Sequence, residues 1–276
     1  HRSLAVSLVS AGIGVAPMTI APLAAWLVTL YGWRTTQLIL GVAAWLLLLP
    51  AVRFIRTSAA KPGDGAALAG SVAEAPLSAG QALRSRAFIL LAAAYFACCA
   101  AHSGPIFHTV SYAIGCGLPM VAAVTIYSME GVAGLAGRLL FGVMADRVGA
   151  KRVLVMGLLI QAFAAAAYLL VRRLEGFYLV AFVFGLAYGG VMPLYATLAR
   201  EAFGTRILGT VLGAASLVSS LGMALGPLLG GWLYDRFGSY AWLYLGSLAV
   251  GLAAAAIAVA FPRQAAVRLR AAPVAG

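Results

Sequence analysis

Charged side chains are scarce in this chain of 276 residues, and long stretches have none. Only 9% of the residues are charged and 63% are hydrophobic, whereas soluble domains carry roughly 25% charged residues. Between Arg86 and Glu130 lie 43 consecutive residues without an acid or a base. A helix crosses the hydrocarbon with about 20 apolar residues, so this stretch is long enough for two crossings and a turn. The composition excludes a soluble globular domain and predicts a chain that lies mostly in lipid.

Several chemical signatures are missing as well. The sequence has no Gly-x-x-x-x-Gly-Lys-Ser/Thr loop, which excludes an ATP-driven pump within this chain. It also lacks His-Glu-x-x-His and a recognisable nucleophile triad, so we predict no catalytic residue, no metal site and no organic cofactor, and we do not expect an enzyme. The cysteines are Cys98, Cys99 and Cys116. Because the first two are adjacent, they cannot form an ordinary structural bridge, and we interpret all three as packing thiols.

Eight apolar runs alternate with short polar turns. Backbone groups cannot stay unpaired in hydrocarbon, so each run is predicted to be a helix and the fold to be all-α and integral to the membrane. The fourth run differs from the others because Glu130 and Arg138 interrupt it. The predicted crossings are residues 4–30, 35–52, 87–112, 118–145, 153–171, 176–199, 207–234 and 240–261.

Lysine and arginine are distributed unevenly over alternate turns. Of the 19, fourteen fall on one side of the predicted crossings and one, Arg138, lies inside a crossing. The remaining four, on the other side, are Arg34, Arg172, Arg173 and Arg236. Cytoplasmic loops carry the excess of basic residues, so the richer side, with both ends of the chain, is predicted to be cytoplasmic. The net charge of +12 therefore indicates orientation in a membrane and no nucleic-acid partner.

The longest polar stretch divides the chain into two crossings before it and six after it. Its Ser, Gly, Pro and Ala content is typical of a linker. We therefore predict that residues 1–55 are the last two helices of an N-terminal bundle and that residues 56–86 are a cytoplasmic linker. Residues 87–262 are then a six-helix C-terminal bundle, and residues 263–276 a cytoplasmic tail.

A weak internal repeat supports this division. Pro22–Leu27 runs into the turn Tyr31–Trp33, and Pro227–Leu233 runs into Phe237-Gly238 in a similar way. The first two crossings thus look like a weak copy of the last two, as in transporters built from two six-helix halves. If the first two crossings are the last pair of an equivalent six-helix unit, we expect four further helices upstream, in agreement with a chain that begins at His1 without a first methionine. The alternative is that small residues and aromatic turns recur in any membrane protein.

The turn after the fourth crossing combines glycine, acid and bases. It reads Gly-Val-Met-Ala-Asp-Arg-Val-Gly-Ala-Lys-Arg from residue 142 to residue 152. This resembles the signature loop of the major facilitator superfamily, with Ala150 at the first basic position. The resemblance implies a conformational gate, in which the acid pairs with nearby basic groups until two bundles rock; a charged loop without such a role is the alternative. The gate residues are Gly142, Asp146, Arg147, Gly149, Lys151 and Arg152.

A second motif lies in the seventh crossing, where small residues recur around a proline. Small residues four apart let helices approach closely, and a proline permits a bend. The superfamily has a similar Gly-Pro motif on its fifth helix and related patterns on its eleventh. We interpret this motif mainly as helix packing. Its residues are Gly222, Gly226, Pro227, Gly230 and Gly231.

The resemblance narrows further to one branch of the superfamily. Phe184–Tyr195 followed by Glu201–Gly204, and the turn Tyr31–Arg34, are similar to the monocarboxylate and oxalate/formate porters. The similarity covers nearly the whole chain as family helices 5 to 12, which implies eight helices of a 12-helix fold with the first four absent. It implies a secondary transporter of a small solute, an organic anion such as a monocarboxylate, that works by alternating access as a symporter or antiporter.

Two rival functions stay open: a drug or sugar porter of the same superfamily, and a non-transporting membrane receptor or scaffold. The partners predicted for the favoured function are a small-molecule solute, a coupling proton and membrane lipid. We expect a monomer in the bacterial cytoplasmic (inner) membrane.

Ionisable residues inside a crossing are functional candidates, because an arginine at mid-bilayer costs about 2.5–3.5 kcal/mol. Arg138 aligns with an arginine that the resemblance implicates in binding the substrate anion, and a guanidinium fork suits a carboxylate; snorkelling to the boundary or pairing with Asp146 are the alternatives. Tyr195 and His108 complete the predicted substrate-binding set, with packing as the alternative for each. Glu130 is predicted to carry the coupling proton; the alternatives are that it balances a nearby cation or forms a structural hydrogen bond between helices.

Overall fold

The structure is a computed structural model that describes residues 2–53 and 78–262. The predicted tail at 263–276 and most of the predicted linker at 56–86 lie outside these residues. The described residues form helices joined by short turns, with no strand among them. They belong to two units, one formed mainly by residues 77–270 and the other mainly by residues 19–76.

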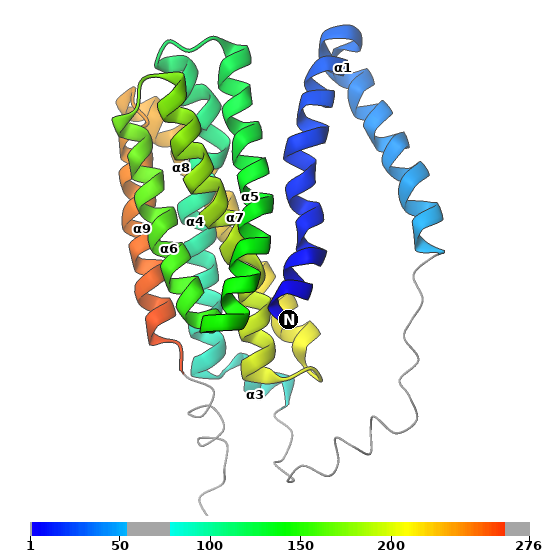
Figure 1. Cartoon of the computed structure of the whole chain (residues 1–276), viewed down its shortest axis with the longest axis vertical. Helices are drawn as coiled ribbons and strands as arrows, with labels where there is room; N and C mark the ends of the chain where they lie inside the picture. Colours follow the sequence, from blue (N-terminus) through cyan, green and yellow to red (C-terminus); the bar gives the residue numbers. More distant parts are fainter. Residues whose placement is uncertain (1, 54–77, 263–276) are drawn as a thin grey trace, which may run out of the picture. The chain divides into compact units, whose positions relative to one another are not determined.

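Helix α1 (Arg2–Val52) contains the first two predicted crossings, and Gly32 breaks it into two segments (Figure 1). The backbone of Gly32 has φ 72° and ψ 165°, a conformation that residues other than glycine rarely adopt. The hydroxyl of Thr36 donates to the carbonyl of Gly32 at 2.9 Å. The turn predicted around Gly32 is thus confirmed, and residues Trp26–Val52 are long and apolar enough to cross a membrane.

The other unit contains six long helices, which run side by side in Figure 1. A short helix, α3 (Ala79–Leu83), precedes them and lies within the predicted linker. Together with Trp26–Val52, these six give seven candidate membrane spans among the described residues. The six are α4 (Arg86–Gly115), α5 (Met120–Val148), α6 (Ala150–Ala167, extended by the 3-10 turn η1 at Tyr168–Leu170), α7 (Leu174–Phe203), α8 (Leu208–Phe237) and α9 (Ala241–Ala260).

Within the six-helix unit, α5 packs along α7 and α4 packs along α8. Helix α6 contacts both α7 and α9, while α9 also contacts α4. The described helix ends differ from the predicted ones by a few residues. Helix α8, for example, continues to Phe237 and ends where Gly238 takes a left-handed conformation with φ 64°, a common way to end a helix.

Glycines bring the paired helices into direct backbone contact. A methyl group added at Gly222 would collide with the carbonyl of Phe96, and one added at Gly226 would collide with Ser103 and Gly104. In the same way, Gly137 of α5 lies against the backbone of Leu186 on α7. Lipid tails are as apolar as leucine, so helices in a membrane associate through such close packing.

The turns at the two ends of the unit are held by basic side chains. At one end, the exposed Arg172 donates to the hydroxyl of Tyr112 at 2.6 Å, and this bond raises the pKa of Arg172. At the other end, Lys151 donates to the carbonyls of Val259 and Phe261. Each bond joins residues far apart in the sequence, so the connections are anchored to neighbouring helices.

The glycine contacts predict the effect of adding a single methyl group to α8. Gly226→Ala should lower the stability of the folded unit by about 1–3 kcal/mol, because overpacking forces the two backbones apart. Thermal unfolding of the purified chain in detergent measures this change. Gly231→Ala is the matched control from the same motif, because nothing lies within 4 Å of a methyl group added there. Equal melting temperatures for the two variants would contradict the packing argument.

Candidate functional site

A cavity of about 370 Å³ lies between α4, α5, α7 and α8. Its size is within the range of small-molecule sites, which is about 300–1,000 Å³. The walls are mainly aromatic and aliphatic, with Ile106, Phe107 and Met192 among them. The polar and aromatic-polar side chains that line it are Tyr95, His102, Tyr127, Arg138, Tyr188, Tyr195 and Ser216.

Arg138 is a cation buried in this cavity. Its side chain comes from the middle of α5 and is 5% exposed. Its Nε has no hydrogen-bond partner among the described residues. The guanidinium thus lies inside the unit and does not extend to water, and it keeps donor capacity for a group that enters the cavity.

Tyr195 lines the same cavity but uses its hydroxyl elsewhere. The hydroxyl donates to the carbonyl of Ala94 at 3.1 Å, which links α7 to α4. The ring stacks on that of Tyr95 with centroids 4.2 Å apart and an interplanar angle of 12°. Tyr195 therefore presents an aromatic surface to the cavity and holds its wall in place.

His108 does not line the cavity. Its Nε2 lies 3.1 Å from the carbonyl oxygen of Pro227, and its ring lies 5.2 Å from that of Tyr240. It therefore fills the contact between α4 and α8. The histidine that does line the cavity is His102, which stacks with Tyr188 at 5.5 Å between centroids. Helical spacing was an available signal, because Tyr95 and His102 are seven residues apart and share a face of α4.

Glu130 is on α5, like Arg138, but it is not one of the residues that line the cavity. Its side chain is 0% exposed. One carboxyl oxygen accepts a hydrogen bond from the hydroxyl of Tyr168 at 2.6 Å, and the other has no partner among the described residues. Rings of Tyr168, Phe184 and Tyr244 surround this region. The two intramembrane charges thus occupy separate environments.

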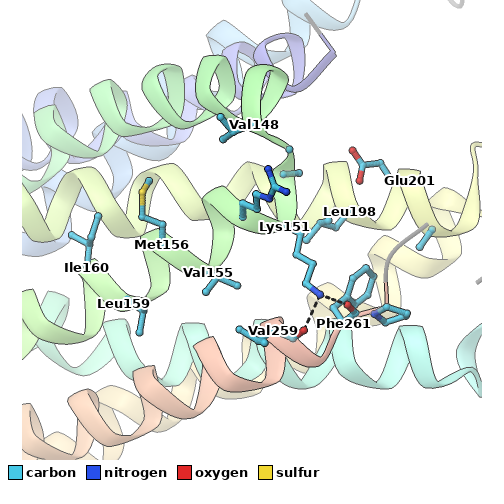
Figure 2. A pocket seen from close by; sticks show the side chains of 15 residues that line it. Val148, Lys151, Val155, Met156, Leu159, Ile160, Leu198, Glu201, Val259 and Phe261 are labelled. Carbon is cyan, nitrogen blue, oxygen red and sulfur yellow. Dashed lines mark hydrogen bonds between the residues drawn. The ribbon is translucent and has the colours of Figure 1, made fainter. Parts of the chain in front are cut away.

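The predicted gate residues lie around the junction of two helices: Gly142, Asp146 and Arg147 in the last turns of α5, Gly149 between the helices, and Lys151 and Arg152 in the first turn of α6. Gly149 has φ 95° and separates the two helices, while Asp146 and Arg147 are exposed at the end of α5. Lys151 reaches across to the carbonyls at the end of α9, as Figure 2 shows. The loop is therefore fastened through α6 to α9.

Comparisons with known proteins agree with this architecture. Residues 1–227 and 125–276 both match the family model described as Major Facilitator Superfamily. Monocarboxylate transporter 13 of Bos taurus is 26% identical over 269 residues, which cover 95% of this chain and 60% of the relative. A multidrug resistance protein B homolog of Mycobacterium tuberculosis is 39% identical over 127 residues, which cover 45% of this chain and 23% of the relative.

A solved structure shares the fold. The crystal structure of the major facilitator superfamily transporter FucP, in the outward conformation, aligns with a TM-score of 0.59 and 18% sequence identity. The alignment covers 84% of this chain and 55% of FucP, and this chain spans 60% of the length of monocarboxylate transporter 13. The predicted family and the helical membrane fold are confirmed: this chain belongs to the major facilitator superfamily.

Proposed function

We propose that the protein moves a small organic anion, a monocarboxylate, across the membrane by alternating access. The observation that carries the proposal is Arg138, a buried guanidinium with an unpaired Nε in a cavity of small-molecule size. A guanidinium binds a carboxylate through two parallel hydrogen bonds. In surroundings from which water is excluded, that recognition gives both charge neutralisation and orientation.

The rest of the cavity favours an anion with one carboxylate and a short apolar body. Arg138 is the one lysine or arginine among the residues that line it, so a second carboxylate would lack a cationic partner. The aromatic rings of Tyr95, Tyr188 and Tyr195 supply a surface for hydrocarbon. Similarity to monocarboxylate transporter 13 over 95% of this chain supports the same substrate class, whereas the drug-resistance relative matches 45% of it.

Alternating access needs a second wall for the cavity. We propose that the six-helix unit is one half of the transporter and that residues 1–55 belong to the other half. The basic ends of the helices lie in the cytoplasm in this proposal, as expected where positive charge marks the inner side of a bacterial membrane. Asp146, Arg147 and Lys151 then lie at the cytoplasmic gate, and the protein acts as a monomer.

Glu130 is proposed as the site of the coupling proton. Its carboxyl forms no bond with Arg138, and one of its oxygens has no partner among the described residues. A carboxyl without a paired cation can take up or release a proton without first breaking an ion pair. The separation of Glu130 from the cavity lets the protein hold a proton and an anion at the same time, as a symporter requires.

The role of Arg138 predicts a loss of anion affinity on substitution. In Arg138→Gln, the apparent affinity of the reconstituted full-length transporter for labelled lactate or pyruvate should fall roughly ten- to hundredfold, because a hydrogen bond to a charged group contributes about 1.5–3 kcal/mol. Arg138→Lys keeps the charge without the fork and should be intermediate.

Arg200→Gln is the control for this series, because Arg200 is exposed near the end of α7 and does not line the cavity. Undiminished carboxylate uptake in Arg138→Gln would remove Arg138 from the proposed role. Transport of uncharged or cationic drugs by the unchanged protein, with no carboxylate uptake, would favour the drug-porter alternative.

The role of Glu130 predicts uncoupling. Glu130→Gln should still exchange the anion but should no longer accumulate it in response to a pH gradient. The amide oxygen can still accept from Tyr168, so this variant keeps the structural hydrogen bond and removes only the titrating group. Glu175→Gln, an exposed acid at the start of α7, is the control. Gradient-driven accumulation that persists in Glu130→Gln would leave this residue with a structural role alone.

A further inference from the structure

A second cavity of about 1120 Å³ opens on the six-helix unit, and it shares no lining residue with the first. It lies where α6 begins and where α7 and α9 end (Figure 2). The proposed anion site does not use this cavity, although the predicted gate residues Gly149, Lys151 and Arg152 are among the residues that line it. We call it the α6 groove and define it by Arg152, Val155, Leu159, Glu201 and Val259.

One wall of the α6 groove is apolar over its whole length. Val155, Met156, Leu159 and Ile160 follow one another along α6, opposite Val259 of α9 (Figure 2). Leu159 is 37% exposed and Val259 is 58% exposed, so much of this surface is uncovered. From Arg152 to Ile160 the helix rises about 12 Å. That length accommodates the upper part of an acyl chain.

The charged residues of the α6 groove gather at one end. Lys151, Arg152 and Glu201 line it there, and none of the residues deeper along α6 is charged. The ammonium of Lys151 donates to the carbonyls of Val259 and Phe261. Arg152 and Glu201 are both exposed, and neither forms an ion pair or a side-chain hydrogen bond with another residue described by the structure. A cation and an anion thus face the entrance.

This arrangement matches the chemistry of one kind of membrane component. A phospholipid has a polar head at the water boundary and apolar chains below it, and basic residues at a helix end lie at the depth of the headgroups. Arg152 is suited to the phosphate, because a guanidinium forms strong hydrogen bonds with phosphate oxygens. Glu201 adds a requirement for a positively charged donor in the same headgroup.

We propose that the α6 groove binds phosphatidylethanolamine, with the phosphate at Arg152, the primary ammonium at Glu201 and an acyl chain along Val155 and Leu159. Phosphatidylcholine meets the charge requirement but its quaternary ammonium has no N–H to donate to a carboxylate. Phosphatidylglycerol offers a phosphate but no cation, so it leaves the carboxylate of Glu201 without a partner in the headgroup. The lipid site is independent of the solute that the cavity beside Arg138 takes.

The site lies next to the predicted gate. The bound lipid would contact the first turns of α6, directly after Gly149, together with the ends of α7 and α9. Occupation of the α6 groove would therefore favour the arrangement in which these three helix ends are together.

The proposal is tested by lipid retention. The full chain is reconstituted in nanodiscs that contain equal amounts of phosphatidylcholine, phosphatidylethanolamine and phosphatidylglycerol, and the lipids that stay bound after release are counted by native mass spectrometry. We expect phosphatidylethanolamine to be enriched about 1.4- to fivefold, since an exposed ion pair contributes about 0.2–1 kcal/mol. Glu201→Gln should lose this preference, and Arg152→Gln should retain less of all three phospholipids.

Arg200→Gln is the matched control, because Arg200 is exposed beside Glu201 but does not line the groove. All three substitutions replace exposed charges, so the variants are expected to fold, and the melting temperature of each checks this. Equal retention of the three lipids by the unchanged protein would overturn the proposal. Enrichment of phosphatidylglycerol would also overturn it, and so would a preference for phosphatidylethanolamine that survives in Glu201→Gln. The same holds if a photoreactive phosphatidylethanolamine labels peptides outside α6, α7 and α9.

Discussion

Direct contact between helix backbones is the constraint on which the rest of this structure depends. In lipid, apolar side chains gain nothing by leaving the solvent, so helices are held by close packing and by hydrogen bonds. Gly134 and Gly137 bring α5 onto α7, and Gly222 and Gly226 bring α8 onto α4. The same contacts position the cavity, because Gly134 lines it one turn before Arg138. A bulkier residue at these glycines would move the walls of the site as well as the helices.

The second organising feature is that two charges on one helix are kept in different surroundings. Glu130 and Arg138 are eight residues apart, or about 12 Å along α5. Arg138 faces a cavity, whereas the carboxyl of Glu130 lies among the rings of Tyr168 and Tyr244. In an ion pair, each side chain would neutralise the charge of the other. Neither group would then require a solute or a proton as its partner. In the proposed function, their separation leaves Arg138 available to a solute and Glu130 available to a proton.

Much of the fold follows from where charge is missing. The uncharged run between Arg86 and Glu130 predicts two crossings, which the structure describes as α4 and α5 up to Glu130. Tyr31–Arg34 predicts the break that occurs at Gly32. Helix ends were less predictable, because α8 runs through Asp235 and Arg236 before Gly238 stops it. Charged residues at a membrane boundary do not end a helix by themselves, and the left-handed glycine does.

The composition of the site was harder to predict, because it depends on which face of each helix turns inward. An apolar helix in lipid can bury any face, so polarity alone did not distinguish His102 from His108. The contact with α8 determines where His108 lies, because Gly230 leaves the space that the ring of His108 occupies. The burial of Glu130 behind the cavity, and its hydrogen bond with Tyr168, likewise depend on the packing of α5 against the end of α6. No periodicity in the sequence predicts that Tyr168 is the hydrogen-bond partner of Glu130.

Lys151, one of the predicted gate residues, joins two helices of the unit. The carbonyls in the last turn of a helix have no partner within it, and they carry partial negative charge. Lys151 donates to the carbonyl of Val259 in the last turn of α9 and to that of Phe261, the residue that caps this helix. The start of α6 and the end of α9 are thereby fastened together, so in the proposed rocking motion both helices would move together with Gly149. A pair joined in this way would transmit the proposed movement at Gly149 to α9, and a lipid held between the two helices would therefore affect the same motion.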